Sequence, residues 1–384
     1  MTVRNDVGPV CLCRLFRGEN HWIGILLARL EARKGDPETA RSRLEAIVGQ
    51  AADAGAGNRA RRELGLVLDK LGCFGSAFER IEQAGLAEAK AAEASGLTPA
   101  GVLGRIAAYE ASYGVSDFHR QRFAIAGDSP APAFLMGFLR SGTTLTEQVL
   151  AAHPHIVTVD EEPLVYELRC RIEQMAGGTD GIPEKLLRLR SEQLVEARRF
   201  YWERVAARVG KLKEDQIFVD KNALNTLEIG LIDTVFPDAK VIFALRDPRD
   251  VCLSAFMQPY MATDMTVSFL SWEGTTAFYG ALMGLWLHLR ERLTLRYVEL
   301  RYEDTVTDLE GQARRVLDML GIRWAPEVLA FHKKARERVI STPTFADVTH
   351  PVHGRSVQRW RRYEPQIQRI RHILQPFIEA FGYE

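Results

Sequence analysis

The sequence predicts an α/β fold, a parallel sheet with helices on both faces, preceded by an all-α helical-repeat region. The N-terminal part repeats itself weakly, a proline-rich break follows at residues 127–132, and short β-prone runs then alternate with helical stretches. Strands separated by helices need crossover connections, which produce a mostly parallel sheet. We therefore expect two domains, residues 1–128 and 129–384, with ligands at the carboxyl ends of the strands.

The N-terminal repeat has a spacing of 37 residues, which superposes Leu27 on Leu64 and Ala40 on Ala77. Each copy predicts two helices joined by a glycine-containing turn, with the alanine on the second helix permitting close packing. The pattern resembles tetratricopeptide repeats, whose period is about 34 residues. An ordinary helical bundle with chance self-similarity is the alternative, and neither interpretation supplies chemistry.

Composition restricts the class of protein. The 50 basic and 50 acidic residues give a formal net charge of zero, so nothing indicates a nucleic-acid partner or a polybasic membrane surface. The longest apolar run, Thr275–His288, is too short to span a membrane. The five cysteines are scattered without a Cys-x-x-Cys pair. We expect a cytoplasmic protein with reduced thiols.

Five strands and six helices are expected after the break. The strands are Phe134–Gly137, Ile156–Val159, Ile217–Val219, Lys240–Leu245 and Arg296–Leu300, and the helices are Thr144–Ala152, Leu164–Met175, Ser191–Val209, Leu224–Val235, Arg249–Gln258 and Val267–Arg292.

The loop after the first expected strand has the glycine spacing of a P-loop, between Gly137 and Gly142. Backbone N–H groups and the following helix N-terminus cradle an anion in such loops. Thr143 stands where an ATPase or kinase has its lysine, and Arg140 supplies the positive charge instead. This argues against ordinary nucleotide hydrolysis, although a plain glycine-containing turn is the alternative.

This loop resembles the 5′-phosphosulfate loop of sulfotransferases that use 3′-phosphoadenosine 5′-phosphosulfate (PAPS), nearest to the bacterial tetratricopeptide-repeat-containing and tyrosylprotein types. The resemblance implies donor contacts from Arg140, Ser141, Gly142, Thr143 and Thr144. Leu139 departs from the family pattern, which usually has proline there, so the loop loses a φ constraint.

A second motif of the family is an Arg and a Ser eight residues apart, which hold the donor's 3′-phosphate. Arg246 and Ser254 match it, directly after the fourth expected strand. A surface ion-pair cluster is the alternative for an isolated Arg-Asp-Pro-Arg segment. Two motifs in the right order, each after a β-run, favour the functional interpretation.

The resemblance also implies the catalytic groups. Counting from His153-Pro154 places Glu161 on the general base of tyrosylprotein sulfotransferases, with Asp160 and Glu162 as alternatives in register. Three adjacent acids are also typical of a helix start. Lys221 matches the family's Asp-Lys pair and, with Arg140, would neutralise charge on the leaving group.

Three further donor contacts follow from the resemblance. Tyr302 matches a Tyr-Glu sequence beside the nucleotide, and a buried tyrosine without a ligand is the alternative. Thr344 and Arg359 match a lid segment near the C-terminus, where Arg355 competes with Arg359 for the basic position.

The function that the resemblance implies is transfer of a sulfuryl group from PAPS to a hydroxyl acceptor, without a metal. A peptide tyrosine, a glycan and a small alcohol all remain open as acceptors, and we expect the helical repeats to present a protein acceptor or to form a homodimer. One alternative is an ATP-dependent phosphoryl-transfer kinase on the same scaffold. The other is a catalytically inert nucleotide-binding adaptor.

Overall fold

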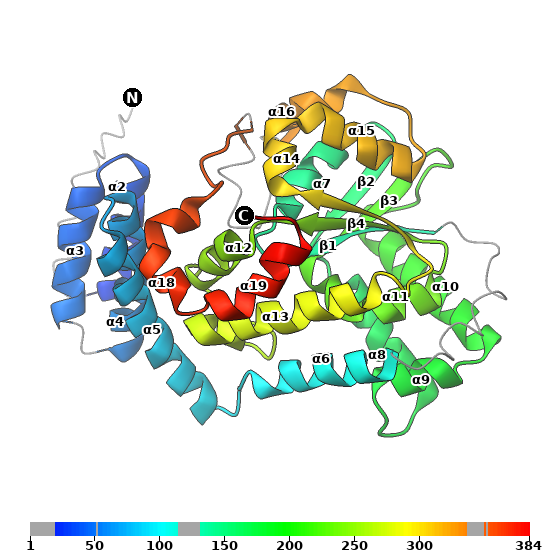
Figure 1. Ribbon diagram of the computed structural model, residues 1–384, viewed down its shortest axis with the longest axis horizontal. Helices are drawn as coiled ribbons and strands as arrows, with labels where there is room; N and C mark the ends of the chain where they lie inside the picture. The colour runs from blue at the N-terminus through cyan, green and yellow to red at the C-terminus, as the bar shows by residue number, and fades with distance from the viewer. Residues whose placement is uncertain (1–19, 51–52, 114–130, 336–348, 351) are drawn as a thin grey trace, which may run out of the picture. The chain divides into compact units, whose positions relative to one another are not determined.

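The structure is a computed structural model that describes residues 20–50, 53–113, 131–335, 349–350 and 352–384 (Figure 1). The chain divides into two compact units. The helical unit consists of Met1–Thr98 and Phe256–Gly274, and the sheet unit consists of Pro99–Ala255 and Thr275–Glu384. The expected division into two domains at residue 128 remains a prediction, since that boundary lies outside the described residues.

The sheet unit contains a five-stranded sheet in which every pairing is parallel. The strands are β1 (Ala133–Gly137), β2 (Ile156–Asp160), β3 (Ile217–Lys221), β4 (Lys240–Leu245) and β5 (Arg296–Arg301). Their order is β2-β3-β1-β4-β5, so the chain leaves the central β1 first to one side and later to the other. All five predicted strands are confirmed, and none differs from the prediction by more than two residues at either end.

The register aligns the strand ends along one edge of the sheet. Asp160 lies opposite Lys221, Gly137 opposite Ala244, and Leu245 opposite Arg301. In open parallel sheets, ligands bind at the carboxyl ends of the strands, at the point where the strand order reverses.

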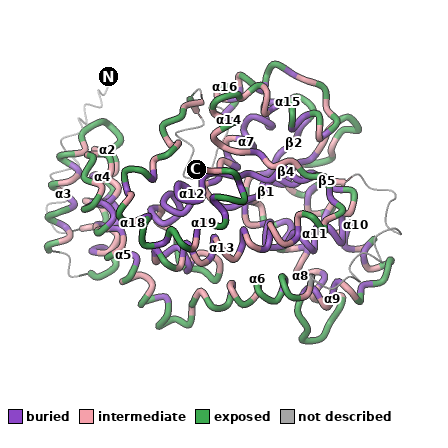
Figure 2. The backbone as a smooth tube through the Cα atoms, viewed as in Figure 1, coloured by how far each residue is buried: buried purple, intermediate pink, exposed green. Residues whose placement is uncertain are grey.

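Helices cover both faces of this sheet, as predicted (Figure 1). On one face, alternate strand residues such as Leu135 and Ile242 pack in one core with Leu150 of α7 (Thr143–Ala151) and Leu317 of α15 (Leu309–Leu320). On the other face, Phe243 stacks on Trp286 of α13 (Trp272–Leu289) at 3.7 Å between ring centroids. Figure 2 shows the strands as mostly buried.

The other helices among the described residues after residue 98 are α6 (Ala100–Tyr113), α8 (Leu164–Ala176), α9 (Ile182–Arg188), α10 (Ser191–Val209), η3 (Ala223–Glu228), α11 (Ile229–Val235), α12 (Pro248–Phe256), η4 (Val267–Leu270), α14 (Tyr302–Thr307), η5 (Pro326–Ala330), α16 (Phe331–Ala335), η6 (Arg359–Tyr363), α18 (Glu364–Gln368) and α19 (Arg371–Ala380). Two predicted helices are each divided into a 3-10 turn and an α-helix. The first break lies at residues 228–229, and the second lies at Ser271.

The helical unit confirms an all-helical N-terminal region. Its helices are α2 (His21–Arg33), α3 (Pro37–Gln50), α4 (Ala54–Lys70) and α5 (Phe74–Ala94). Ala40 and Ala77 are fully buried in the second helix of each pair. Phe256 and Trp272 of the inserted segment both contact the ring of Phe78 on α5, at 5.1 and 5.6 Å between ring centroids.

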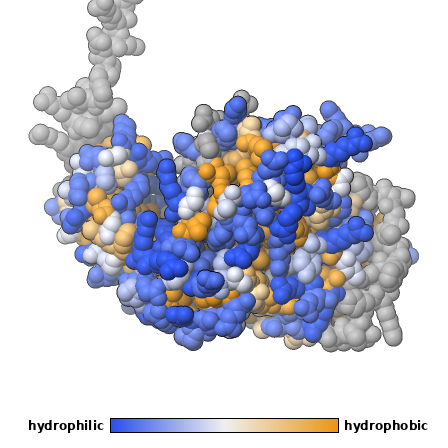
Figure 3. All heavy atoms as spheres, turned by 45° about the horizontal axis from the view of Figure 1, so that its top comes forward, coloured by the Kyte–Doolittle hydropathy of each residue, from blue (hydrophilic) through white to orange (hydrophobic). Residues whose placement is uncertain are grey.

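The surface is mixed in character. Figure 3 shows a face that is mostly hydrophilic, with hydrophobic side chains in smaller groups. No helix in the described ranges is long and apolar enough to cross a membrane.

Close approach of α4 and α5 generates a stability prediction. A Cβ on Gly65 would lie 2.5 Å from Cγ1 of Ile81 and 2.9 Å from the carbonyl oxygen of Ala77. We expect overpacking in Gly65→Ala to lower the free energy of unfolding by about 1–3 kcal/mol. The higher helix propensity of alanine offsets up to about 1 kcal/mol of this loss. Gly75→Ala on the same helix pair is the control, because nothing lies within 4 Å of its Cβ.

Urea unfolding followed by circular dichroism checks this prediction. Gly75→Ala should raise the unfolding midpoint slightly, because alanine restricts the unfolded chain and favours the helix. Equal midpoints for the two variants would show that the helices of this pair do not pack as closely as described.

Candidate functional site

The loop between β1 and α7 is the first part of the site. Gly142 has φ +97°, and a Cβ there would lie 2.8 Å from the Tyr302 ring, so glycine is required both by conformation and by space. Arg140 also lies in the left-handed region, with φ +71°. Such backbone strain in a non-glycine residue is typical of functional loops. The hydroxyl of Ser141 closes the turn by donating to the carbonyl of Phe138 at 2.6 Å.

Thr143 and Thr144 begin α7 and are buried. Their backbone N–H groups belong to the first turn of the helix, the end of a helix that favours a bound anion. The structure thus places the predicted loop residues at one helix N-terminus on the carboxyl edge of the sheet.

Arg246 is the second part of the site and connects it to the loop. Its guanidinium donates to the carbonyl of Arg140 at 3.1 Å and lies over the Tyr302 ring at 4.8 Å. The side chain of Arg140 in turn donates from Nε to the hydroxyl of Ser254 at 3.1 Å. Four of the predicted donor contacts therefore form one continuous cluster.

The Arg246 side chain is 8% exposed and its Nε lacks a hydrogen-bond partner within the described residues. A buried N–H group without an acceptor is costly, by about 1–3 kcal/mol. The carboxylate of Asp250 lies 3.8 Å from the guanidinium, and burial raises the pKa of Asp250 to about 6. An anion beside Nε would satisfy this group.

Lys221 is the third part of the site. Its side chain is completely buried, and Nζ donates to Asp160 Oδ1 at 2.7 Å and to Glu161 Oε1 at 2.8 Å. Glu161 has φ +57°, which the hydrogen bond from its N–H to the carbonyl of Lys221 stabilises at 2.8 Å. Glu162 lies apart from this group, because its carboxylate pairs with Arg208 at 3.1 Å.

Asp220 was not predicted as a site residue, although it directly precedes Lys221. It is fully buried, and it accepts hydrogen bonds from the Tyr201 hydroxyl at 2.9 Å and the Asn225 amide at 3.4 Å. Burial raises the pKa of Asp220 to about 7, and these two donors oppose the rise. The Asp-Lys sequence at a strand end was the signal that could have found it.

The C-terminal segment reaches the same edge through Trp360, which directly follows Arg359 and was not among the predicted site residues. The Trp360 N–H donates to Asp250 Oδ1 at 2.8 Å, and its indole N–H donates to Asp247 Oδ2 at 3.1 Å. Arg249 stacks on the Trp360 ring at 3.9 Å and forms a 2.8 Å ion pair with Asp247. The carbonyl of Ser356 accepts from Arg246. Buried carboxylates thus hold this segment beside Arg246.

The remaining predicted donor contacts are Arg359, with Arg355 as its alternative, Thr344 and Tyr302. Arg359 is half-buried at the start of η6, directly before Trp360, and Arg355 is exposed. Thr344 lies outside the described residues. Tyr302 is brought into the site by its contacts with Gly142 and Arg246.

Comparisons with known proteins place the chain in a family. The profile described as "Sulfotransferase family" matches residues 132–326, about half of the chain. The chain therefore belongs to the sulfotransferase family.

Two curated relatives and one solved structure are similar. An uncharacterized protein of Aquifex aeolicus is 32% identical over 256 residues, 64% of this chain and 32% of that protein. Sulfotransferase 2A2 of Rattus norvegicus is 31% identical over 103 residues, 24% of this chain and 34% of the relative. The chain thus spans about a third of the length of each relative. The sulfotransferase domain from the Synechococcus PCC 7002 olefin synthase is 20% identical, with a TM-score of 0.47 over 69% of this chain and 99% of that domain.

The raised pKa of Asp220 generates a pH prediction. The unfolded chain releases this proton near pH 4, and the folded chain releases it near pH 7. Protonation therefore favours the folded state, so the stability that Asp220 contributes is present below about pH 4 and is lost as pH rises to about 7. Within this window the free energy of unfolding of the parent should fall by about 1.4 kcal/mol per pH unit relative to that of Asp220→Asn.

Urea unfolding of both proteins between pH 4 and pH 8 checks the sign and the window. Tyr201→Phe removes a donor that lowers the pKa of Asp220, so it should extend the loss to higher pH. Parallel pH profiles for the parent and Asp220→Asn would contradict the raised pKa.

Proposed function

We propose that the chain transfers a sulfuryl group from PAPS to a hydroxyl acceptor in the cytoplasm. The observation that carries the proposal is the buried Arg246 guanidinium, which faces both the glycine loop and Tyr302 and keeps an unpartnered Nε within the described residues. Membership of the sulfotransferase family supports it.

The residues present fit a donor with two anionic ends. One end would occupy the N–H groups of the P-loop-type segment at residues 141–144, and the 3′-phosphate would lie against Arg246 and Ser254. Arg140 is hydrogen-bonded to Ser254 and belongs to the loop, so it links the two anion sites. A bidentate guanidinium suits a phosphate, because its planar N–H groups match two phosphate oxygens.

The donor supplies an activated sulfuryl group whose departure leaves negative charge on a phosphate oxygen. Lys221 and Arg140 are the cations that would stabilise this charge. Burial strengthens the effect of Lys221, since little solvent screens it. The proposed reaction requires no divalent metal.

Glu161 is the proposed general base that accepts the proton of the acceptor hydroxyl. Its side chain is 44% exposed, so an acceptor can reach it, and its contact with Lys221 orients it. Asp160 is 21% exposed and shares the same lysine, so it is the alternative base. The pairing of Glu162 with Arg208 favours a structural role for that residue.

We also propose that the helical unit consists of tetratricopeptide-like repeats that present an acceptor peptide or a second copy of the chain. Trp22, Leu26 and Leu30 support this role, because they recur every four residues along α2 and are 49, 56 and 51% exposed. Apolar stripes of this kind are typical of docking faces. Among sulfotransferases, the proposed subtype is the repeat-containing, tyrosylprotein-like one.

A kinase on the same scaffold is the second candidate function, because the loop has P-loop spacing. Thr143 in place of the loop lysine disfavours it. Incubation with labelled PAPS in the presence of a chelator, and separately with labelled ATP and Mg²⁺, distinguishes the two. The sulfotransferase proposal expects label transfer only from PAPS, and an inert adaptor would give transfer from neither.

Arg246 generates a binding prediction. The parent should bind 3′-phosphoadenosine 5′-phosphate (PAP) far better than AMP, because only PAP carries the phosphate that Arg246 would hold. Arg246→Ala should weaken PAP binding by at least about thirty-fold and abolish the preference. Isothermal calorimetry measures both affinities. Arg314→Ala, which removes an exposed guanidinium paired with Glu310, is the control and should leave both unchanged. Equal affinities of the parent for PAP and AMP would refute the assignment.

Glu161 generates a kinetic prediction. Glu161→Gln should lower turnover by roughly two to four orders of magnitude, because the amide cannot accept the proton, while PAP affinity stays nearly unchanged. Transfer of label from PAPS to a tyrosine-containing peptide provides the rate, and calorimetry provides the affinity. Glu162→Gln is the matched control and should retain most of the rate. If Asp160→Asn is inactive and Glu161→Gln is not, the base is Asp160.

A further inference from the structure

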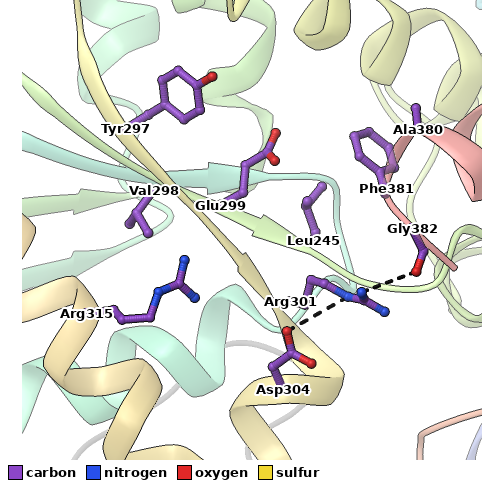
Figure 4. Close-up of a pocket in the computed structure, with 10 residues that line it drawn as sticks. All are labelled: Leu245, Tyr297, Val298, Glu299, Arg301, Asp304, Arg315, Ala380, Phe381 and Gly382. Atoms are coloured by element: carbon purple, nitrogen blue, oxygen red, sulfur yellow. Dashed lines mark hydrogen bonds and ion pairs between the residues drawn. The ribbon is translucent and has the colours of Figure 1, made fainter.

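A hollow of about 460 Å³ lies along β5, apart from the residues proposed for transfer (Figure 4). It extends around the strand, because its lining comes from both faces of the sheet. Tyr297 and Arg301 belong to the face covered by α13, whereas Val298 belongs to the face covered by α15 and lies near Arg315 of that helix. The end of α19 contributes Phe381. The floor of the hollow is therefore the outer edge of β5.

β5 is the last strand of the sheet, and among the described residues it pairs only with β4. An edge strand leaves its outward N–H and C=O groups without strand partners. Arg296 and Tyr297, at the start of the strand, are exposed. An extended chain can therefore pair with this edge through its backbone.

Arginines stand at both ends of β5 and beside its edge, and two acids, Glu299 and Asp304, also line the hollow. Arg296 and Arg301 lie at the two ends of β5, and Arg315 lies between α15 and the strand edge. The ion pairs of the described residues do not include Arg315, which donates only to the neutral Gln312 side chain. Arg301 has partners of its own: it donates to the carbonyl of Gly382 at 3.3 Å, lies over the Tyr383 ring at 4.1 Å and reaches Asp304 at 4.0 Å.

The one acid on β5 is already engaged. Glu299 Oε1 accepts from the Trp286 indole at 2.8 Å and from Arg290 at 2.9 Å. It therefore does not neutralise the arginines at the strand ends. A strand with carboxylates is complementary to this edge, because each carboxylate would meet a guanidinium that lacks a strong ion pair.

Arg296, which is exposed at the start of β5, also disfavours a second copy of the strand as the occupant, because charged side chains on an open edge oppose self-association.

We propose that the β5 edge binds an extended acidic peptide segment of a partner protein, which pairs with the strand and extends the sheet. Backbone hydrogen bonds would supply much of the affinity, and Arg296 and Arg315, on the side of the strand covered by α15, would select carboxylates on one face of the peptide. The proposal does not depend on the transfer reaction, because none of these arginines is placed in the donor or catalytic cluster.

The test uses the full chain and a fluorescein-labelled peptide of about eight alternating valines and glutamates, a usual strand length. Fluorescence anisotropy should show binding that weakens as salt concentration rises. Two comparison peptides should not bind: one with lysine in place of glutamate, and one with N-methylated backbone amides on alternate residues. Equal binding of the N-methylated peptide would overturn the proposal, because attraction would then not involve strand pairing.

Arg315→Glu should weaken binding of the glutamate peptide by roughly two- to thirty-fold, because it replaces an attraction by a repulsion. Arg199→Glu is the control, since Arg199 is 71% exposed on α10, outside the hollow, and it should bind as the parent does. PAP binding should be unchanged in both variants, which shows that the fold is intact. Absence of peptide binding to the parent, or self-association in sedimentation that Arg315→Glu relieves, would overturn the proposal.

Discussion

The structure of the site depends on the buried guanidinium of Arg246. It donates to the Arg140 carbonyl of the glycine loop and to the Ser356 carbonyl of the C-terminal segment, and it lies over the Tyr302 ring that follows β5. Three segments distant in sequence therefore meet at one cation. Burial of a charge is costly unless acceptors surround it, so this cation constrains the position of each segment around it.

The parallel register makes this meeting possible. It ends β1, β3, β4 and β5 at one edge, so the residue after each strand enters the same region. Lys221 ends β3 with its two carboxylate partners, and Arg246 follows β4. The two cations thus serve different roles on one edge: Lys221 is balanced by acids, whereas Arg246 retains an unpartnered Nε in the described structure. That asymmetry is why we assign the donor's 3′-phosphate to Arg246.

Much of the sheet could be predicted, because short apolar runs alternating with helical stretches depend on local sequence. That the loop residues would lie beside Arg246 and Ser254 could be predicted because motif spacing is also local. The contact between Trp360 and Asp250 was not predicted, because it joins positions 110 residues apart and no local pattern reports it. The grouping of Phe256–Gly274 with the N-terminal helices was missed for the same reason, since it depends on aromatic packing against Phe78.

The central claim is that one ligand connects the glycine loop to Arg246. A crystal structure of the protein with PAP tests it most directly. The account predicts the 3′-phosphate within hydrogen-bond distance of the Arg246 guanidinium and the Ser254 hydroxyl, with the 5′-phosphate at the N-terminus of α7. PAP bound elsewhere, or bound at this edge with Arg246 still donating only to the carbonyls of Arg140 and Ser356, would contradict the account.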